Sequence, residues 1–301
     1  MIKPFLNFKL NFNFDFFSLK LLAAFFSGIL ILVSLFLAAK KNLNFGIDFI
    51  GGIMIDAKFS SIPNLNDLRF ELDQIDIGNF EIQEFGTPDN ILIKLEKQKG
   101  EDEKQIEVIK KVKQVLPSDV DYRRIEFVGP KVGDELKAMG IKAVLFSLFA
   151  MFMYIWFRFS GWEFGIGALV ALIHDVLTTI GFFAVSQIEF NLSSIAAILT
   201  IAGYSINDTV VVFDRIRENI NKTDNLSFKD LLNKSINQTL SRTLMTSITT
   251  LLALFALFIL GGDVIKGFIL AMIWGVLIGT YSSIFIASPL IATLGFKLEK
   301  K

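Results

Sequence analysis

Cysteine is missing from this chain of 301 residues, and histidine occurs once, as His174. Without cysteine the protein can form no disulfide, no thiol nucleophile and no thiolate metal site. A single histidine cannot by itself build a histidine-rich zinc or copper centre. We therefore expect neither a metal ion nor a cofactor in this protein.

The chain also lacks an excess of charge of either sign, because 30 basic residues balance 30 acidic ones. Nucleic-acid-binding proteins usually carry a basic patch, so we expect no nucleic-acid partner. Apolar residues are abundant instead: 52% of the sequence is hydrophobic, and mean hydropathy is +0.54. Several apolar runs reach the roughly 20 residues that span a bilayer. The composition therefore predicts a polytopic α-helical membrane protein that sits in a lipid bilayer.

These runs predict six transmembrane helices. Their expected ranges are 18–39, 138–157, 164–185, 190–213, 244–260 and 264–294. The first run could instead be a secretory signal peptide, because Lys20 precedes it and Leu37-Ala38-Ala39 resembles a cleavage site. It is longer than the usual signal core and further spans follow it, so we expect an uncleaved helix. Residues 1–17 are too polar to span a membrane and are expected to form a cytoplasmic tail.

Basic residues in the short connections predict the orientation of the spans. Lys or Arg occurs in the tail, in the turn at 158–163, in the segment 214–243 and at the C-terminal end, whereas the loops at 186–189 and 261–263 contain neither. The basic connections fall on one side, which the positive-inside rule places in the cytoplasm together with both termini. Within the membrane region 138–301, residues 221–241 have amphipathic spacing and are expected to lie along the cytoplasmic surface.

Residues 40–137 have the polar composition of a soluble domain between the first and second spans. Strand-like spacing occurs at 45–59, 80–85, 91–96 and 121–128, with helical spacing at 65–75 and 102–116. The order β-α-β-β-α-β is typical of a ferredoxin-like domain, an antiparallel sheet with both helices on one face. The orientation of the spans places this domain in a periplasm. It contains no obvious catalytic set of residues, so we expect a contact surface.

An acidic residue, Asp208, interrupts the apolar sequence of the fourth span. An Asp near the middle of a membrane helix costs roughly 2.5 to 3.5 kcal/mol on insertion scales, so Asp208 should face other helices. Thr200, Tyr204 and Asp208 follow one another at intervals of four residues and should share a helix face, with Asn207 beside it. The alternative is that Asp208 only holds helices together through hydrogen bonds.

Three further residues complete a candidate proton site. His174 and Asp175 lie near the middle of the third span, and Arg242 precedes the fifth span in a threonine-rich segment that includes Thr246. Burial favours the protonated form of a carboxyl, whereas a nearby guanidinium favours its charged form. Movement of Arg242 relative to Asp208 would therefore switch proton affinity. Asp175 with His174 would be a relay or a second anchor, and His174 fits a hydrogen-bonded core histidine equally well.

Five motifs resemble the SecF family of bacterial protein-export membrane proteins. They are NFGIDFIGG at 44–52, FVGPKVGDEL at 127–136, HDVLTTIG at 174–181, GYSINDTVVVFDRIREN at 203–219 and SRTLMTSITT at 241–250. The resemblance implies a six-helix half of a transporter of the resistance-nodulation-division superfamily in the bacterial inner membrane. It implies SecD as the pairing partner, with the SecYEG translocon, YajC and, indirectly, SecA, and translocating preproteins as substrate. It also implies use of proton motive force without enzyme activity, and it links Asp208 and Arg242 to proton transport.

Three other functions remain open at the level of sequence. A half-transporter of the same superfamily could export a small molecule or lipid by proton antiport, although its single small outer domain disfavours this. An aspartyl intramembrane protease would pair Asp175 with Asp208, but the YD and GxGD signatures are missing. A scaffolding subunit would require no change in the charge of Asp208.

Overall fold

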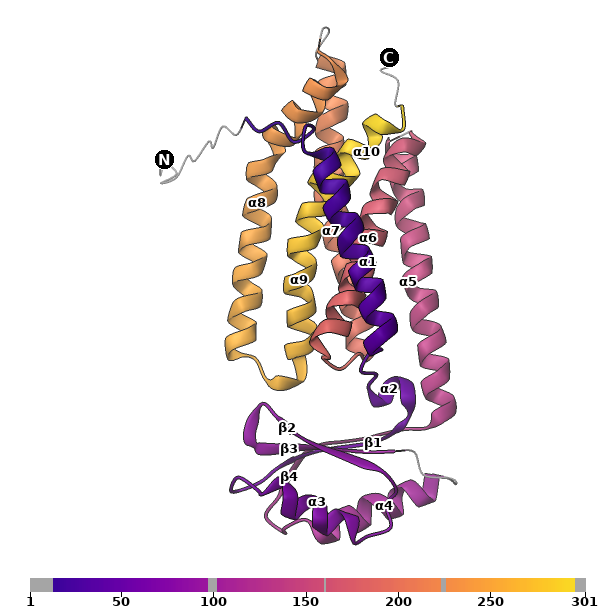
Figure 1. Cartoon of the computed structure of the whole chain (residues 1–301), viewed down its shortest axis with the longest axis vertical. Helices are drawn as coiled ribbons and strands as arrows, with labels where there is room; N and C mark the ends of the chain where they lie inside the picture. Colours follow the sequence, from indigo (N-terminus) through magenta and orange to yellow (C-terminus); the bar gives the residue numbers. More distant parts are fainter. Residues whose placement is uncertain (1–12, 97–101, 160, 223–225, 296–301) are drawn as a thin grey trace, which may run out of the picture.

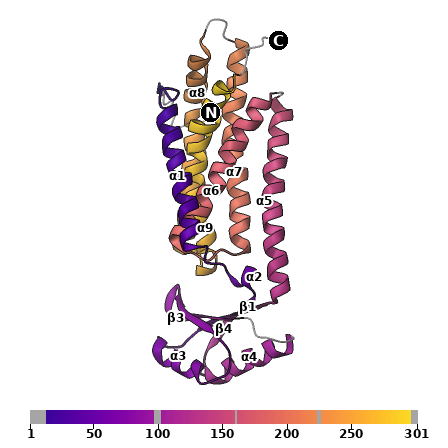
Figure 2. The same cartoon turned by 45° about the vertical axis from the view of Figure 1, so that its right-hand side comes forward.

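The computed structural model describes residues 13–96, 102–159, 161–222 and 226–295. Residues 1–12 of the expected tail and the basic C-terminal end, 296–301, lie outside these ranges. Within them, six helical segments are long and apolar enough to cross a membrane. They are α1 (Lys20–Lys41), α5 (Pro130–Phe159), α6 (Trp162–Ser186), α7 (Leu192–Lys222), α8 (Phe228–Leu260) and a broken span made of α9 (Lys266–Ser282), η2 (Ser283–Ala287) and α10 (Ser288–Thr293). They form one bundle, with the start of α1 and the end of α10 far from the β-sheet (Figure 1, Figure 2).

The helix boundaries extend beyond the apolar runs that predicted them. Helix α5 begins at Pro130 rather than at 138, and α7 continues to Lys222 rather than ending at 213. Proline suits the first turn of a helix because its fixed φ is helical and its missing N–H would have no partner there. The apolar run marks only the part of a helix that matches hydrocarbon, so polar turns at either end escaped the prediction.

Most of the expected amphipathic segment, 221–241, is continuous with the fifth span. Helix α8 runs without interruption from Phe228 to Leu260, so most of the amphipathic segment is the polar first half of the fifth span. No glycine or proline occurs between these residues, and nothing in the backbone breaks the helix. Ser227 caps its start, because its Oγ accepts a hydrogen bond from the Asp230 backbone N–H at 3.2 Å.

The last span is also not the single helix expected over 264–294. It starts with a 3-10 turn, η1 (Asp263–Ile265), and changes to the π-helical turn η2 before α10. Pro289, in the first turn of α10, has no backbone N–H and crowds the preceding turn of a regular α-helix. A π-helical turn at this point is the local widening by which a helix accommodates such a residue.

The described end of the N-terminal tail, residues 13–17, packs on the first turns of α8. The Phe17 backbone N–H donates to Asn233 Oδ1 at 3.0 Å, Asn233 Nδ2 donates to Asp15 Oδ1 at 2.6 Å, and Lys229 Nζ lies 3.1 Å from Asp15 Oδ2. The hydrogen bond from Asn233, followed by that from Lys229, holds the pKa of Asp15 below its usual value. These contacts attach the segment before α1 to α8.

The polar segment between α1 and α5 forms a four-stranded antiparallel sheet with two helices. In chain order the elements are β1 (Gly52–Lys58), α3 (Leu65–Asp73), β2 (Phe80–Phe85), β3 (Thr87–Leu95), α4 (Asp102–Val115) and β4 (Asp121–Val128). The strand order is β2-β3-β1-β4, and both helices cover the sheet face turned away from the bundle (Figure 1). Alternate side chains such as Ile53, Ile55 and Ile93 pack under these helices, as a period of two requires.

The first expected strand, 45–59, is wrong in its first half. Residues Ile47–Ile50 form a short helix, α2, and only Gly52–Lys58 are a strand. Gly51 and Gly52 have φ of 73° and 132°, a conformation that glycine adopts readily and that changes the direction of the chain here. Strand β3 likewise begins at Thr87 rather than at the expected residue 91, so only Gly86 separates it from β2.

Candidate functional site in the helix bundle

Asp208 lies on the inward face of α7 with only 2% of its surface exposed. Within the part of the chain that the structure describes, its Oδ2 has no hydrogen-bond partner. Arg242 and Thr246 of α8 face this carboxyl, but the Arg242 side chain is exposed at the bundle surface. No direct ion pair joins Arg242 and Asp208 in the described chain, in contrast to Arg158 and Asp214 at the bundle end, which lie 3.0 Å apart. The guanidinium is therefore near the carboxyl without being bound to it.

Asp175, on α6, is fully buried and well provided with partners. Its Oδ2 accepts hydrogen bonds from Ser205 Oγ of α7 at 2.6 Å and from Ser282 Oγ of α9 at 2.8 Å. Its Oδ1 lies 3.0 Å from Nδ1 of the neighbouring His174. Three helices thus meet at one carboxylate, which makes Asp175 an anchor of the bundle. Ser205 and Ser282 could not be recognised as its partners from the sequence, because serine is common in membrane helices.

His174 is 1% exposed, and its Nε2 has no partner in the described residues. Its ring centroid is 6.0 Å from that of Tyr281, whose hydroxyl donates to the Ala23 carbonyl of α1 at 3.0 Å. The same hydroxyl lies 2.9 Å from Ser27 Oγ. Polar groups therefore continue from the Asp175 anchor toward α1, and one ring nitrogen of His174 is left available inside the bundle.

The remaining expected residues divide between the interior and the surface. Tyr204 is half-buried, and its hydroxyl donates to Ser247 Oγ at 3.3 Å. Ser247 Oγ in turn lies 2.7 Å from Thr280 Oγ1. Asn207 and Thr200 are exposed. Thr200, Tyr204 and Asp208 lie on one side of the continuous helix α7, as expected, but that side runs from an exposed Thr200 to a buried Asp208.

Two glycines let α7 and α9 approach closely enough to build the Asp175 anchor. A Cβ atom at Gly279 would lie 3.0 Å from Ser205 Cβ, and one at Gly275 would overlap the side chain of Ile201. Small residues at such crossings let helix backbones come close in a membrane. The glycines thus place Ser205 and Ser282 within hydrogen-bonding distance of Asp175. A pair of catalytic aspartates would lie in contact with each other. Among the described residues, no hydrogen bond joins Asp175 to Asp208.

The start of α7 is attached to the segment between α1 and the sheet. The Leu192 backbone N–H, in the first turn of α7, donates to Asp48 Oδ2 of α2 at 2.9 Å. Just before α7, Glu189 Oε2 lies 2.6 Å from Lys94 Nζ of β3, and Phe190 forms a parallel bridge with Phe45. We call this set of contacts the joint. The helix that carries Asp208 is thereby linked to both α2 and the sheet.

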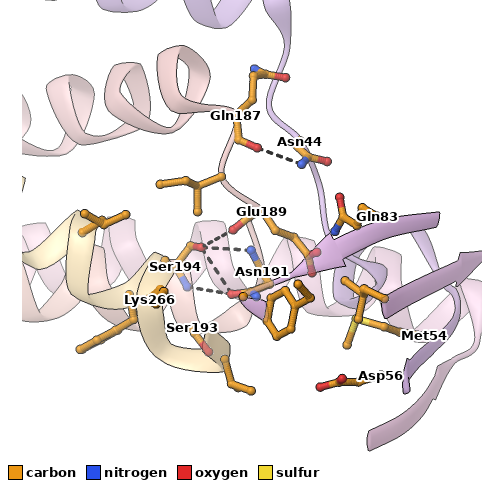
Figure 3. A pocket seen from close by; sticks show the side chains of 18 of the residues that line it. Asn44, Met54, Asp56, Gln83, Gln187, Glu189, Asn191, Ser193, Ser194 and Lys266 are labelled. Carbon is orange, nitrogen blue, oxygen red and sulfur yellow. Dashed lines mark hydrogen bonds between the residues drawn. The ribbon is translucent and has the colours of Figure 1, made fainter. Parts of the chain in front are cut away.

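A cavity of about 360 Å³ with a mixed polar and apolar lining lies beside the joint, between the sheet and the nearby ends of the helices. Figure 3 shows Glu189, Asn191 and Ser194 on one side of it and Met54 and Asp56 on the strands opposite. Asp56 is 3% exposed, and its Oδ1 has no partner among the described groups. The cavity thus separates part of the sheet from the helix ends next to the joint.

Comparison with known proteins assigns the chain to a family. Residues 107–297 match the family model described as protein export membrane protein SecD/SecF, C-terminal, and residues 36–61 match the SecD/SecF GG motif. The chain is 44% identical to protein translocase subunit SecF of Rickettsia rickettsii (strain Sheila Smith), over 96% of this chain and 94% of that protein. It is 45% identical to the SecF subunit of Rickettsia conorii (strain ATCC VR-613 / Malish 7), with the same coverage.

Solved structures give the same result. The crystal structure of SecDF from Thermus thermophilus, described as a translocon-associated membrane protein, matches with a TM-score of 0.82 and 36% identity over 97% of this chain. SecDF in the Super-membrane-facing form matches with a TM-score of 0.69 and 35% identity over 95%. This chain spans 40% and 39% of those two chains. The chain is therefore a polytopic helical membrane protein that belongs to the SecF family of protein translocase subunits.

Proposed function

We propose that this chain pairs with a SecD subunit and uses proton motive force to promote late steps of protein export through the Sec translocon. The observation that carries the proposal is Asp208, a buried carboxyl whose Oδ2 has no partner in the described residues. A buried ionisable group in a membrane helix marks a proton or ion pathway more often than a structural contact. Each proton that crosses 100 mV supplies about 2.3 kcal/mol, enough to bias a conformational equilibrium.

In this proposal Asp208 binds and releases the proton, and Arg242 is its movable counter-charge. The guanidinium faces Asp208 without an ion pair, so a small shift of α8 against α7 would change the distance between them. Approach of the cation favours the charged carboxylate, and its retreat favours the protonated form. Asp175 is the fixed anchor against which this movement occurs, because its carboxylate is held from α7 and α9.

The joint would carry the movement to the outer domain. A displacement of α7 would move α2 through the hydrogen bond that the Leu192 N–H donates to the Asp48 carboxylate. It would move β3 through the ion pair between Glu189 and Lys94. We take the four-stranded domain to be ferredoxin-like because its elements follow the order β-α-β-β-α-β. We take it to be periplasmic because it lies at the end of the bundle away from the start of α1 (Figure 1). It would contact the preprotein as that chain leaves SecYEG, with YajC and SecA as further members of the pathway.

The exposed polar groups of α7 and α8 favour a partner subunit on that side of the bundle. Asn207 and Arg242 are both exposed within or beside membrane spans. An Arg that faces lipid costs about 2.5 to 3.5 kcal/mol on insertion scales, so a protein surface should cover it. The similarity to 40% of a longer SecDF chain supports a SecD subunit as this cover.

The test uses Asp208→Asn and, separately, Arg242→Ala, with Asp214→Asn as the matched control. Asp214 is a carboxylate on the same helix whose ion pair with Arg158 is exposed, and such pairs contribute about 0 to 1 kcal/mol. We expect the first two variants to lose export in cells and proton conductance of the reconstituted complex with SecD. The control should retain both. Normal export and conductance in Asp208→Asn would leave only a scaffolding role.

A further inference from the structure

A groove lined almost entirely by apolar residues opens on the side of the bundle formed by α5. Its volume is about 510 Å³, and it lies between α5, α6 and the first turns of α7. Representative lining residues are Ile141, Val144 and Leu148 of α5, Val176 and Ile180 of α6, and Ile198 of α7. Phe45 and Phe49, from α2 and the segment before it, line its end nearest the sheet. We call this the α5 groove.

The α5 groove faces the hydrocarbon of the bilayer. In the most apolar part of α5 only 11% of the residues are buried, and Ile141 and Leu145 of the groove are 54% and 61% exposed. Helix α8, which carries Arg242, lies on the opposite side of the bundle from α5 (Figure 1, Figure 2). The groove is therefore separate from the face that we assign to the partner subunit.

One charged residue, Lys137, lines the α5 groove among its described residues. Its side chain is exposed, and Nζ lies 4.6 Å from the ring centroid of Phe45 at the end nearest the sheet. It forms no ion pair with a described acidic residue, although Asp134 and Glu135 precede it on the same helix. An unpaired cation at the mouth of an apolar groove, at the level where the helices leave the membrane, is complementary to an anionic lipid headgroup.

We propose that the α5 groove binds an acyl chain of an anionic phospholipid, whose phosphate lies on Lys137. The volume falls within the roughly 300 to 1,000 Å³ of small-ligand sites, and apolar walls with a single polar group are typical of such sites. The lipid comes from the leaflet on the side of the sheet domain. The proposal does not depend on proton transport, because neither Asp208 nor Arg242 lines the groove.

The experiment uses the full chain with its SecD partner in vesicles of phosphatidylethanolamine and phosphatidylglycerol. A trace of phosphatidylglycerol or phosphatidylethanolamine carries a photoreactive diazirine on one acyl chain, and labelled peptides are identified by mass spectrometry. We expect phosphatidylglycerol to label the groove segments of α5 and α6 in preference to the rest of the bundle. Lys137→Gln should reduce this labelling about fivefold, which corresponds to the ~1 kcal/mol of one lysine near an anionic surface.

Matched controls come from the same helix. Lys142 is exposed but does not line the groove, so Lys142→Gln should leave the labelling unchanged. Val144→Trp should fill the groove and remove labelling by both lipids, whereas Phe146→Trp, at a position 73% exposed outside the groove, should not. If Val144→Trp fails to fold, the two lysine variants decide the question.

Three results would overturn the proposal. Labelling spread evenly along α5 would show ordinary contact with bulk lipid. Equal labelling in Lys137→Gln and Lys142→Gln would remove the headgroup site. A photoreactive amino acid placed at position 144 could also form crosslinks. Crosslinks from it to a partner helix, with no lipid adduct, would show that a protein segment fills the groove.

Discussion

The two buried aspartates should respond in opposite ways to truncation, and this difference tests their assigned roles most directly. Asp175→Ala removes three side-chain hydrogen bonds, from His174, Ser205 and Ser282. Hydrogen bonds between membrane helices contribute on average about 0.6 kcal/mol each and at most about 1.7. We therefore expect Asp175→Ala to lower the free energy of unfolding by about 2 kcal/mol.

Asp208→Ala should behave differently although the residue is almost as buried. Its Oδ2 has no partner in the described structure, so the contact with Thr246 is the one hydrogen bond that the variant loses, and removal of a buried carboxyl relieves its desolvation, which offsets that loss. We expect a change within about 0.5 kcal/mol, or a small gain in stability. The same variant should abolish proton-coupled export, so stability and function separate at this position.

The assay is equilibrium unfolding of the purified chain in mixed micelles, followed by circular dichroism as the fraction of denaturing detergent rises. Ser205→Ala combined with Ser282→Ala keeps the Asp175 carboxylate but removes the two interhelical donors, so it should give an intermediate loss. In Asp175→Ala, by contrast, Ser282 keeps its hydroxyl, which already donates to the Gly279 carbonyl at 3.2 Å. Equal losses for Asp175→Ala and Asp208→Ala, or a larger loss for the latter, would refute the division into anchor and proton carrier.

Three further predictions concern packing, the joint and the tail. Gly279→Ala should destabilise the bundle by about 1 to 3 kcal/mol, because its methyl group would meet α7 at 3.0 Å. Gly203→Ala on the exposed face of α7, with no atom within 4 Å, should be neutral or stabilising in the same unfolding assay. Lys94→Glu should break the ion pair with Glu189 and so make hydrogen exchange in β3 faster. The double variant Lys94→Glu/Glu189→Lys should restore slow exchange. If exchange stays fast in the double variant, the ion pair is not the cause. The lowered pKa of Asp15 means that its contact with α8 is present near neutral pH and is lost as pH falls through that lowered value. A spin label on a cysteine introduced in the tail should then become mobile only at acid pH, and Asp15→Asn should remove this pH dependence.

The spans and most of the sheet domain could be predicted because they depend on local patterns. Apolar run length determines where a helix can cross a bilayer, and a period of two in Phe80–Phe85 and Asp121–Val128 predicts strands that the structure places at the same residues. The failures occur where a longer-range contact changes a local preference. Ile47–Ile50 has strand-like residues, yet it forms α2, where Asp48 bonds to α7 and Phe49 packs on Phe190.

The sequence by itself determined which ionisable groups enter the membrane, because each charged residue in an apolar run is visible without coordinates. Only the tertiary structure decided their different situations: Asp175 is surrounded by donors, Asp208 keeps an unpartnered oxygen, and Arg242 lies at the surface. The reason is that helical periodicity gives the relative positions of residues on one helix, but not the rotation of that helix against its neighbours. That rotation depends on packing between helices, and here the approach of α7 to α9 at Gly275 and Gly279 fixes it.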